Sequence, residues 1–144
     1  MQILHTRTWL AVLTASAVGV GAVILFGPPP DYRPDVEKTT SVTFWRKGTT
    51  CTATAEEVLA IREALLSAEV IGHEEYPGAV GEYLRLAHAN GDATDVTVMY
   101  FGAAQGPAAR YYLMGSVLQS TKLDALMVQL RERASAKSRS GGSR

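Results

Sequence analysis

The hydrophobic pattern divides the chain into one unbroken apolar segment near the N-terminus and a longer region in which apolar and polar residues interchange. The apolar segment runs from Trp9 to Phe26, eighteen residues without a charge. A helix of that length, rising about 1.5 Å per residue, measures about 27 Å, close to the roughly 30 Å of hydrocarbon in a bilayer. We therefore expect residues 9–26 to form a transmembrane helix, preceded by a short cytoplasmic segment at residues 1–8.

A cleaved signal peptide is the main alternative for this segment. Signal peptides carry about 7–15 apolar residues before a cleavage site of small residues. Ala15-Ser16-Ala17 comes too early for such a site, and cleavage after Val20-Gly21-Ala22 would leave the apolar run Val23–Phe26 at the new terminus. A buried helix of a soluble protein is the other alternative, which the three prolines at 28–30 and the all-round apolarity disfavour. The pattern favours a retained signal anchor.

Charges on the two sides of this segment predict its orientation. His5 and Arg7 precede it, whereas Asp31, Asp35 and Glu37 are among the charges that follow it. Positive charge near a membrane span stays preferentially in the cytoplasm. We therefore expect a single-pass protein of the inner (plasma) membrane, with its N-terminus in the cytoplasm and its domain outside, in the periplasm of a Gram-negative cell.

The regions that flank the domain are recognisable by composition. Prolines at 28, 29, 30 and 34 predict a stiff, extended spacer over residues 27–39. Residues 134–144 are rich in Ser, Gly and basic residues, which predicts a disordered basic tail. The domain is thereby expected to occupy residues 40–133.

Within residues 40–133 the pattern alternates between helical and extended periods. Thr54 and Glu57 form a capping box that should start a helix ending near Ala68 or Glu69, and Ser120 or Thr121 should cap a second one. Strands are expected at 41–46, 70–71, 82–88, 95–101 and 109–117, the fourth paired with the third across the turn 90–92 and the last holding Tyr111, Leu113 and Val117 on one face. This segregated order predicts an α+β domain with an antiparallel sheet of about four strands packed by two helices.

The formal charge of zero conceals an uneven distribution. The region from Asp31 to Arg133 holds ten Lys or Arg and all fourteen Asp or Glu, whereas residues 135–144 hold three basic residues and no acidic one. A nucleic-acid-binding domain normally clusters basic residues on one face of its fold. We therefore expect no nucleic-acid partner.

Signatures of catalysis do not stand out in the sequence. It has no Gly-x-Ser-x-Gly and no His-Glu-x-x-His, and the connection at 102–107 lacks the Lys-Ser or Lys-Thr that follows a phosphate-binding loop. His73, Glu74, Glu75 and His88 could supply zinc ligands, but their spacing is not that of a known site and a solvated surface explains the acids more simply. We expect no metal and no cofactor, and we disfavour an enzyme.

Cys51 is the sole cysteine and lies between the first predicted strand and the first predicted helix. Three interpretations are open. The thiol can be packed and inert, which is the ordinary state of a free cysteine. It can form an intermolecular disulfide, which would make a homodimer. It can also be a nucleophile activated by the helix N-terminus, which would require a histidine base nearby.

Aromatic and arginine side chains on the predicted strands are the candidate binding surface. Because neighbouring strand residues point to opposite faces, one face can form the core while the other presents an aromatic patch of the kind found at interfaces. The sequence alone favours the plainer interpretation, in which tyrosine hydroxyls reach water on a solvated face. The residues that we predict to bind a partner are Trp45, Arg46, Tyr83, Arg85, Arg110 and Tyr112.

These features predict a membrane-anchored, noncatalytic interaction module that binds a protein partner in the cell envelope, as an accessory, inhibitor or immunity-type protein. A small-ligand sensor or carrier, with a pocket between sheet and helices, is the alternative from another class. An enzyme that depends on Cys51 is a third and less favoured hypothesis.

Overall fold

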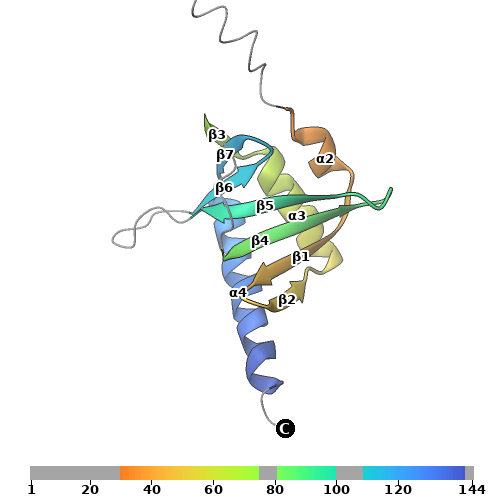
Figure 1. Cartoon of the computed structure of the whole chain (residues 1–144), viewed down its shortest axis with the longest axis vertical. Helices are drawn as coiled ribbons and strands as arrows, with labels where there is room; N and C mark the ends of the chain where they lie inside the picture. Colours follow the sequence, from red (N-terminus) through yellow and green to blue (C-terminus); the bar gives the residue numbers. More distant parts are fainter. Residues whose placement is uncertain (1–29, 75–80, 100–108, 142–144) are drawn as a thin grey trace, which may run out of the picture.

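The computed structural model describes residues 30–74, 81–99 and 109–141 (Figure 1). The predicted membrane span at 9–26, the predicted strand end at Tyr100 and Phe101, and the connection at 102–107 lie outside these residues. No helix in the described ranges is both long and apolar enough to cross a membrane. The elements, in chain order, are α2 (Arg33–Glu37), β1 (Thr39–Arg46), β2 (Thr49–Thr52), α3 (Ala55–Leu66), β3 (Glu69–His73), β4 (Glu82–His88), β5 (Ala93–Met99), β6 (Arg110–Leu113), β7 (Ser116–Gln119) and α4 (Thr121–Ser140).

The strands form one antiparallel sheet of seven, in the order β2-β1-β4-β5-β6-β7-β3. The predicted α+β class and the predicted hairpin of β4 and β5 are confirmed. Gly91 supplies the positive φ of 91° in the hairpin turn, a conformation that glycine adopts without steric cost. The predicted edge strand at Val70 and Ile71 is also confirmed, since β3 forms an edge of the sheet beside β7.

The sheet has more strands than the sequence predicted because β2 and β7 were not expected as separate strands. The segment 109–117 was expected to be one strand, but Met114 and Gly115 adopt positive φ values of 50° and 86° and fold it back as β6 and β7. Lys47 and Gly48 (φ 43° and 80°) do the same between β1 and β2. As a result, Val117 pairs with Tyr112 and points away from the face that holds Tyr111 and Leu113.

Both long helices lie on the same face of the sheet (Figure 1). The predicted capping box starts α3, where the Glu57 backbone N–H donates to Thr54 Oγ1 (3.3 Å) and the Thr54 N–H donates to Glu57 Oε2 (2.7 Å). Ser120 caps α4 by accepting from the Leu123 N–H (3.2 Å). The largest side chains buried between helices and sheet are Phe44, Ile61, Leu65, Leu84, Leu86, Tyr111, Leu113, Leu118, Leu123, Met127 and Leu130.

The predicted extended spacer at 27–39 is wrong over its second half. Residues 33–37 form helix α2, with Pro34 in the first turn, where its missing N–H costs no hydrogen bond. Tyr32 and Val36 are buried and belong to the core. The folded domain therefore begins near residue 31 instead of residue 40.

The predicted disordered tail is also corrected over most of its length. Helix α4 continues to Ser140, although its last buried side chain is Ala134. The final turns of α4 extend past β2 at the end of the molecule opposite α2 (Figure 1). Lys137 and Arg139 lie in the last turn, where their positive charges stabilise the helix by interacting with the negative end of its dipole. A prediction of disorder from composition alone does not include this effect.

Candidate functional site

The helix-free face of the sheet carries a row of side chains that crosses all seven strands. Each member is directly opposite the next in the strand register, so the row is continuous. From the β2 edge to the β3 edge its members are Thr50, Trp45, Tyr83, Thr97, Tyr112, Val117 and Gly72. We call this set the aromatic row.

The aromatic rings of the row are held in place by their neighbours. Trp45 and Tyr83 stack with ring centroids 5.7 Å apart and planes 5° from parallel. The guanidinium of Arg85 lies 5.7 Å from the centre of the Tyr83 ring, within cation–π range. Arg85 also donates two hydrogen bonds to Asp95, at 2.9 and 3.0 Å, and these hold the pKa of its guanidinium above the usual value.

Two uncharged members of the row are buried, whereas its aromatic rings are half-exposed. Thr97 is 3% exposed between Tyr83 and Tyr112, and Val117 is 2% exposed beside Tyr112. Trp45, Tyr83 and Tyr112 themselves are of intermediate exposure. The indole N–H of Trp45 is buried and has no acceptor in the described part of the structure. A buried donor without an acceptor costs about 1–3 kcal/mol.

The structure brings together five of the six residues that the sequence predicted to bind a partner. Trp45, Tyr83 and Tyr112 belong to the row. Arg85 and Arg110 lie on the same face, each two residues along its strand from a tyrosine of the row, and on opposite sides of the row. Arg46 is not on this face. It is paired with Glu82, and its phase on β1 is that of the core residue Phe44.

Arg46 contributes instead to a cluster on the helix-covered side. The Glu82 side chain is 5% exposed and is held between two arginines. Arg46 Nε lies 2.9 Å from Glu82 Oε1, and Arg131 of α4 contacts Oε2 through Nε (3.0 Å) and Nη2 (2.9 Å). Sequence reasoning missed Glu82 as a site residue, although an acidic residue on the core phase of an alternating strand is a recognisable signal.

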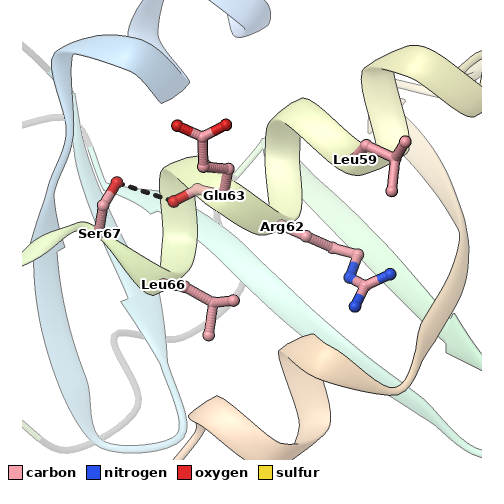
Figure 2. Close-up of a pocket in the computed structure, with 5 residues that line it drawn as sticks. All are labelled: Leu59, Arg62, Glu63, Leu66 and Ser67. Carbon is pink, nitrogen blue, oxygen red and sulfur yellow. Dashed lines mark hydrogen bonds between the residues drawn. The ribbon is translucent and has the colours of Figure 1, made fainter.

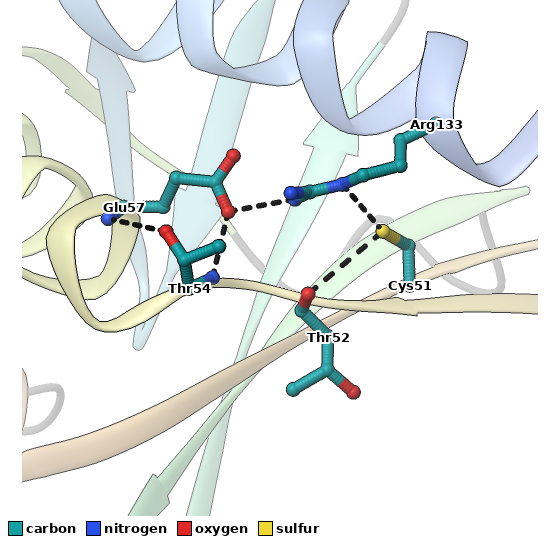
Figure 3. Close-up of polar contacts among 5 residues, drawn as sticks. All are labelled: Cys51, Thr52, Thr54, Glu57 and Arg133. Atoms are coloured by element: carbon teal, nitrogen blue, oxygen red, sulfur yellow. Dashed lines mark hydrogen bonds and ion pairs between the residues drawn. The ribbon is translucent and has the colours of Figure 1, made fainter.

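Cys51 lies in β2, on the face covered by α4, and is 7% exposed (Figure 3). Arg133 of α4 donates from Nε to the thiol sulfur (3.2 Å) and from Nη2 to Glu57 (2.6 Å). Its pKa is raised by the hydrogen bond to Glu57 and then by that to Cys51. Burial acts to raise the pKa of Glu57, but hydrogen bonds from Arg133 and Thr54 outweigh it and hold that pKa below its usual value.

In the part of the chain that the structure describes, no histidine lies beside Cys51 to act as the base that a cysteine nucleophile requires. The hydrogen-bond partners of Sγ are Arg133 and the carbonyl of Thr52, and neither His73 nor His88 contacts it in the described structure. A disulfide to another chain would first require the Arg133 side chain to move. The predicted intermolecular disulfide remains a prediction.

The residues considered for a metal site are not assembled. His73 is on β3 at one edge of the sheet, and His88 is on β4, separated from it by β5, β6 and β7. At about 4.8 Å per strand this separation is about 19 Å. Glu75 lies outside the described residues, within which no cluster of three or more His, Cys, Asp or Glu could hold a metal ion.

A cleft of about 400 Å³ follows the outer side of α3 (Figure 2). It is open to solvent and is lined by Leu59, Arg62, Glu63, Leu66 and Ser67. Leu59 is 62% exposed, and the Ser67 hydroxyl donates back to the Glu63 carbonyl (2.7 Å). All five residues belong to α3 or its cap, so this cleft is not the pocket between sheet and helices that the sensor hypothesis predicted.

Comparison of the chain with protein-family models, curated proteins and solved structures gives no match. The function is therefore argued from the geometry of its surfaces.

Proposed function

We propose that this protein is a membrane-anchored, noncatalytic interaction module that binds a protein partner through the aromatic row. The observation that carries the proposal is the placement of Trp45, Tyr83 and Tyr112 in one row on the face that neither α3 nor α4 covers. Large, rigid aromatic rings lose little conformational entropy on binding and are enriched at the centres of interfaces. A face designed only for water would carry polar residues in these positions.

The chemistry of the face indicates what the partner must supply. Arg85 is already neutralised by Asp95, so it serves mainly to hold the Tyr83 ring. The buried members Thr97 and Val117 contribute no charge. The partner surface should therefore be largely apolar at its centre, with hydrogen-bonding groups at the rim that reach the tyrosine hydroxyls.

The apolar segment 9–26 supports the location of this activity. Its length and lack of charge favour a retained anchor in the inner membrane, with the domain on the extracytoplasmic side. Confinement to a membrane surface raises the local concentration of a partner in the same envelope, so a modest interface is sufficient. An accessory, inhibitor or immunity-type role fits these properties.

Site-specific photocrosslinking in native membranes tests the proposal. A photoreactive amino acid at position 85 or 112 should give a discrete adduct with a second protein, because both positions flank or belong to the row. The control is position 128 on α4, where Val128 is 49% exposed on the opposite side of the molecule. Adducts only with the protein itself, or equal adducts from position 128, would refute a partner on the sheet face.

A matched pair of substitutions tests the contribution of the row itself. Tyr83→Ser removes a half-exposed ring from the row, and Leu59→Ser removes an exposed apolar side chain from α3. We expect Tyr83→Ser to weaken partner capture about tenfold or more, since central aromatic anchors carry about 2 kcal/mol or more of binding energy. Leu59→Ser should leave capture unchanged. Equal effects of the two substitutions would contradict the proposal.

A further inference from the structure

A second surface lies at the end of the molecule where α4 projects beyond the sheet. A cleft of about 360 Å³ is formed there between the end of β1 and the last turns of α4. Three of its six lining residues are arginines. The lining residues are Arg46, Arg131, Glu132, Ser135, Ala136 and Arg139. We call this feature the arginine cleft.

The buried carboxylate of Glu82 fixes two walls of the arginine cleft. It contacts Arg46 from β1 and Arg131 from α4, both at 2.9 Å, so the two guanidinium groups are held side by side. Their side chains remain 40% and 24% exposed. Guanidinium groups held in advance lose less freedom when they bind an anion.

The projecting turns of α4 supply the third arginine. Ala134 is the last buried residue of the helix, and residues 136–140 are exposed. Arg139 lies eight positions after Arg131, a little over two helical turns along α4, and lines the cleft. Lys137 is also exposed but does not line it. Such an extension packs against nothing described in the fold, and short unpacked helical turns are marginally stable in water.

Charge is separated along the molecule. The region that comprises Arg46, Lys47, Glu82, α4 from Arg131 onward and Glu57, which contacts Arg133, contains six Lys or Arg (46, 47, 131, 133, 137, 139) and three Glu (57, 82, 132). The other described residues contain six basic and ten acidic side chains. Folding therefore places Arg46 and Lys47 beside the basic residues of the last turns of α4, so positive charge lies at one end of the molecule.

We propose that the arginine cleft binds a carboxylate-rich segment of a partner protein. Arginine forks match carboxylates in geometry, and the cleft already recognises one carboxylate in Glu82. The acidic remainder of the molecule disfavours a long polyanion such as a nucleic acid. The last turns of α4, which line the cleft, lie at the end of the molecule opposite α2, where the chain enters the described domain (Figure 1). This surface is separate from the aromatic row and does not depend on it.

Fluorescence anisotropy with a labelled decaglutamate peptide tests this proposal on the full chain in non-ionic detergent. The salt concentration is about 0.1 M, because exposed charges more than about 10 Å apart are then largely screened. The informative substitution is Arg139→Glu, and the matched control is Lys137→Glu, which makes the same charge change on the same turn outside the cleft. Both residues lie beyond the buried part of α4, and circular dichroism verifies that both variants remain folded.

We expect Arg139→Glu to weaken decaglutamate binding about tenfold, and Lys137→Glu to weaken it less than about threefold. Equal losses would show that only net charge matters and would overturn the cleft as a site. Absence of decaglutamate binding to the unmodified chain would overturn it as well. Labelled oligothymidylate is the second probe. Tighter binding of oligothymidylate, with the larger dependence on Arg139, would replace the carboxylate assignment by a phosphate one.

Discussion

At the scale of single residues, Arg133 links α4 to α3 through Glu57 and to β2 through Cys51 (Figure 3). Glu57 has two functions, since it completes the capping box of α3 and accepts the Arg133 hydrogen bond at 2.6 Å. The sequence identified the first function, because a capping box is a local pattern. It could not identify the second, because Arg133 lies 76 positions further along the chain.

The lowered pKa of Glu57 predicts how stability depends on pH. The ionised carboxylate is favoured in the folded state, so its contribution is complete above the ordinary pKa of about 4.5 and is lost as pH falls through the lower folded value. Glu57→Gln keeps a capping-box side chain but removes the charge. We expect it to lower the free energy of unfolding by about 1 kcal/mol at pH 7, with the difference shrinking below about pH 4.5.

Urea unfolding of the unmodified protein and of Glu57→Gln, between pH 7 and about pH 3, measures the difference in their free energies of unfolding. Glu63→Gln is the control, because Glu63 pairs with Lys122 in an exposed ion pair (2.6 Å) that also lowers its pKa. Salt should abolish the small effect of Glu63→Gln and leave most of the effect of Glu57→Gln, whose side chain is 16% exposed. A constant difference across the pH range would contradict the assigned role of the Glu57 charge.

At the scale of elements, local patterns predicted the helices and the β4–β5 hairpin but not the two short hairpins. Asn-Gly and Asp-Gly are the strong signals for turns with positive φ at both central residues, and these turns use Lys47-Gly48 and Met114-Gly115. A missed turn also inverts the facing of every later residue in the strand, which explains the error for Val117. Arg46 was placed on the wrong face for a different reason: it directly follows Trp45, and alternation along β1 puts it with Phe44.

Two substitutions in the β1–β2 turn test whether Lys47 and Gly48 both adopt positive φ values there. Lys47→Asn should raise the free energy of unfolding by about 0.5–1 kcal/mol, because asparagine tolerates the left-handed conformation better than lysine. Gly48→Ala should lower it by about 1 kcal/mol, although a Cβ there would meet no atom within 4 Å. Urea unfolding checks both changes. Effects of the same sign would indicate that the turn is not the one described.

At the scale of the whole molecule, the candidate surfaces arise from topology that the sequence pattern does not contain. Five of the six residues predicted to bind a partner share one face, because strand alternation is a local property. The union of Trp45, Tyr83 and Tyr112 into one row depends on the strand order β1-β4-β5-β6, which joins segments far apart in the chain. The arginine cleft depends likewise on α4 passing the end of β1, and on Arg131 meeting Glu82 from 49 positions away.

The N-terminal boundary of the domain is the other property of the whole molecule that folding redefines. Val36 is fully buried and α2 contacts α3, so the segment read as a spacer contributes to the core. Val36→Ala should therefore lower the free energy of unfolding of the full chain by about 1–2 kcal/mol. Glu37→Ala, next to it and exposed, should have no measurable effect. Equal, negligible effects in urea unfolding would restore the spacer interpretation.

If Val36→Ala destabilises the domain as expected, the residues from Tyr32 onward belong to the fold. Only residues 27–31 then remain to join the apolar segment to it. Fully extended, five residues reach at most about 18 Å. If residues 9–26 are retained as an anchor, as we propose, so short a tether holds the domain close to the bilayer surface, with α2 at the near end and the last turns of α4, which line the arginine cleft, at the far end (Figure 1). The aromatic row, on the side of the sheet between these ends, would then meet partners that stand beside the protein in the same membrane, whereas the cleft would meet acidic segments that approach from the aqueous side.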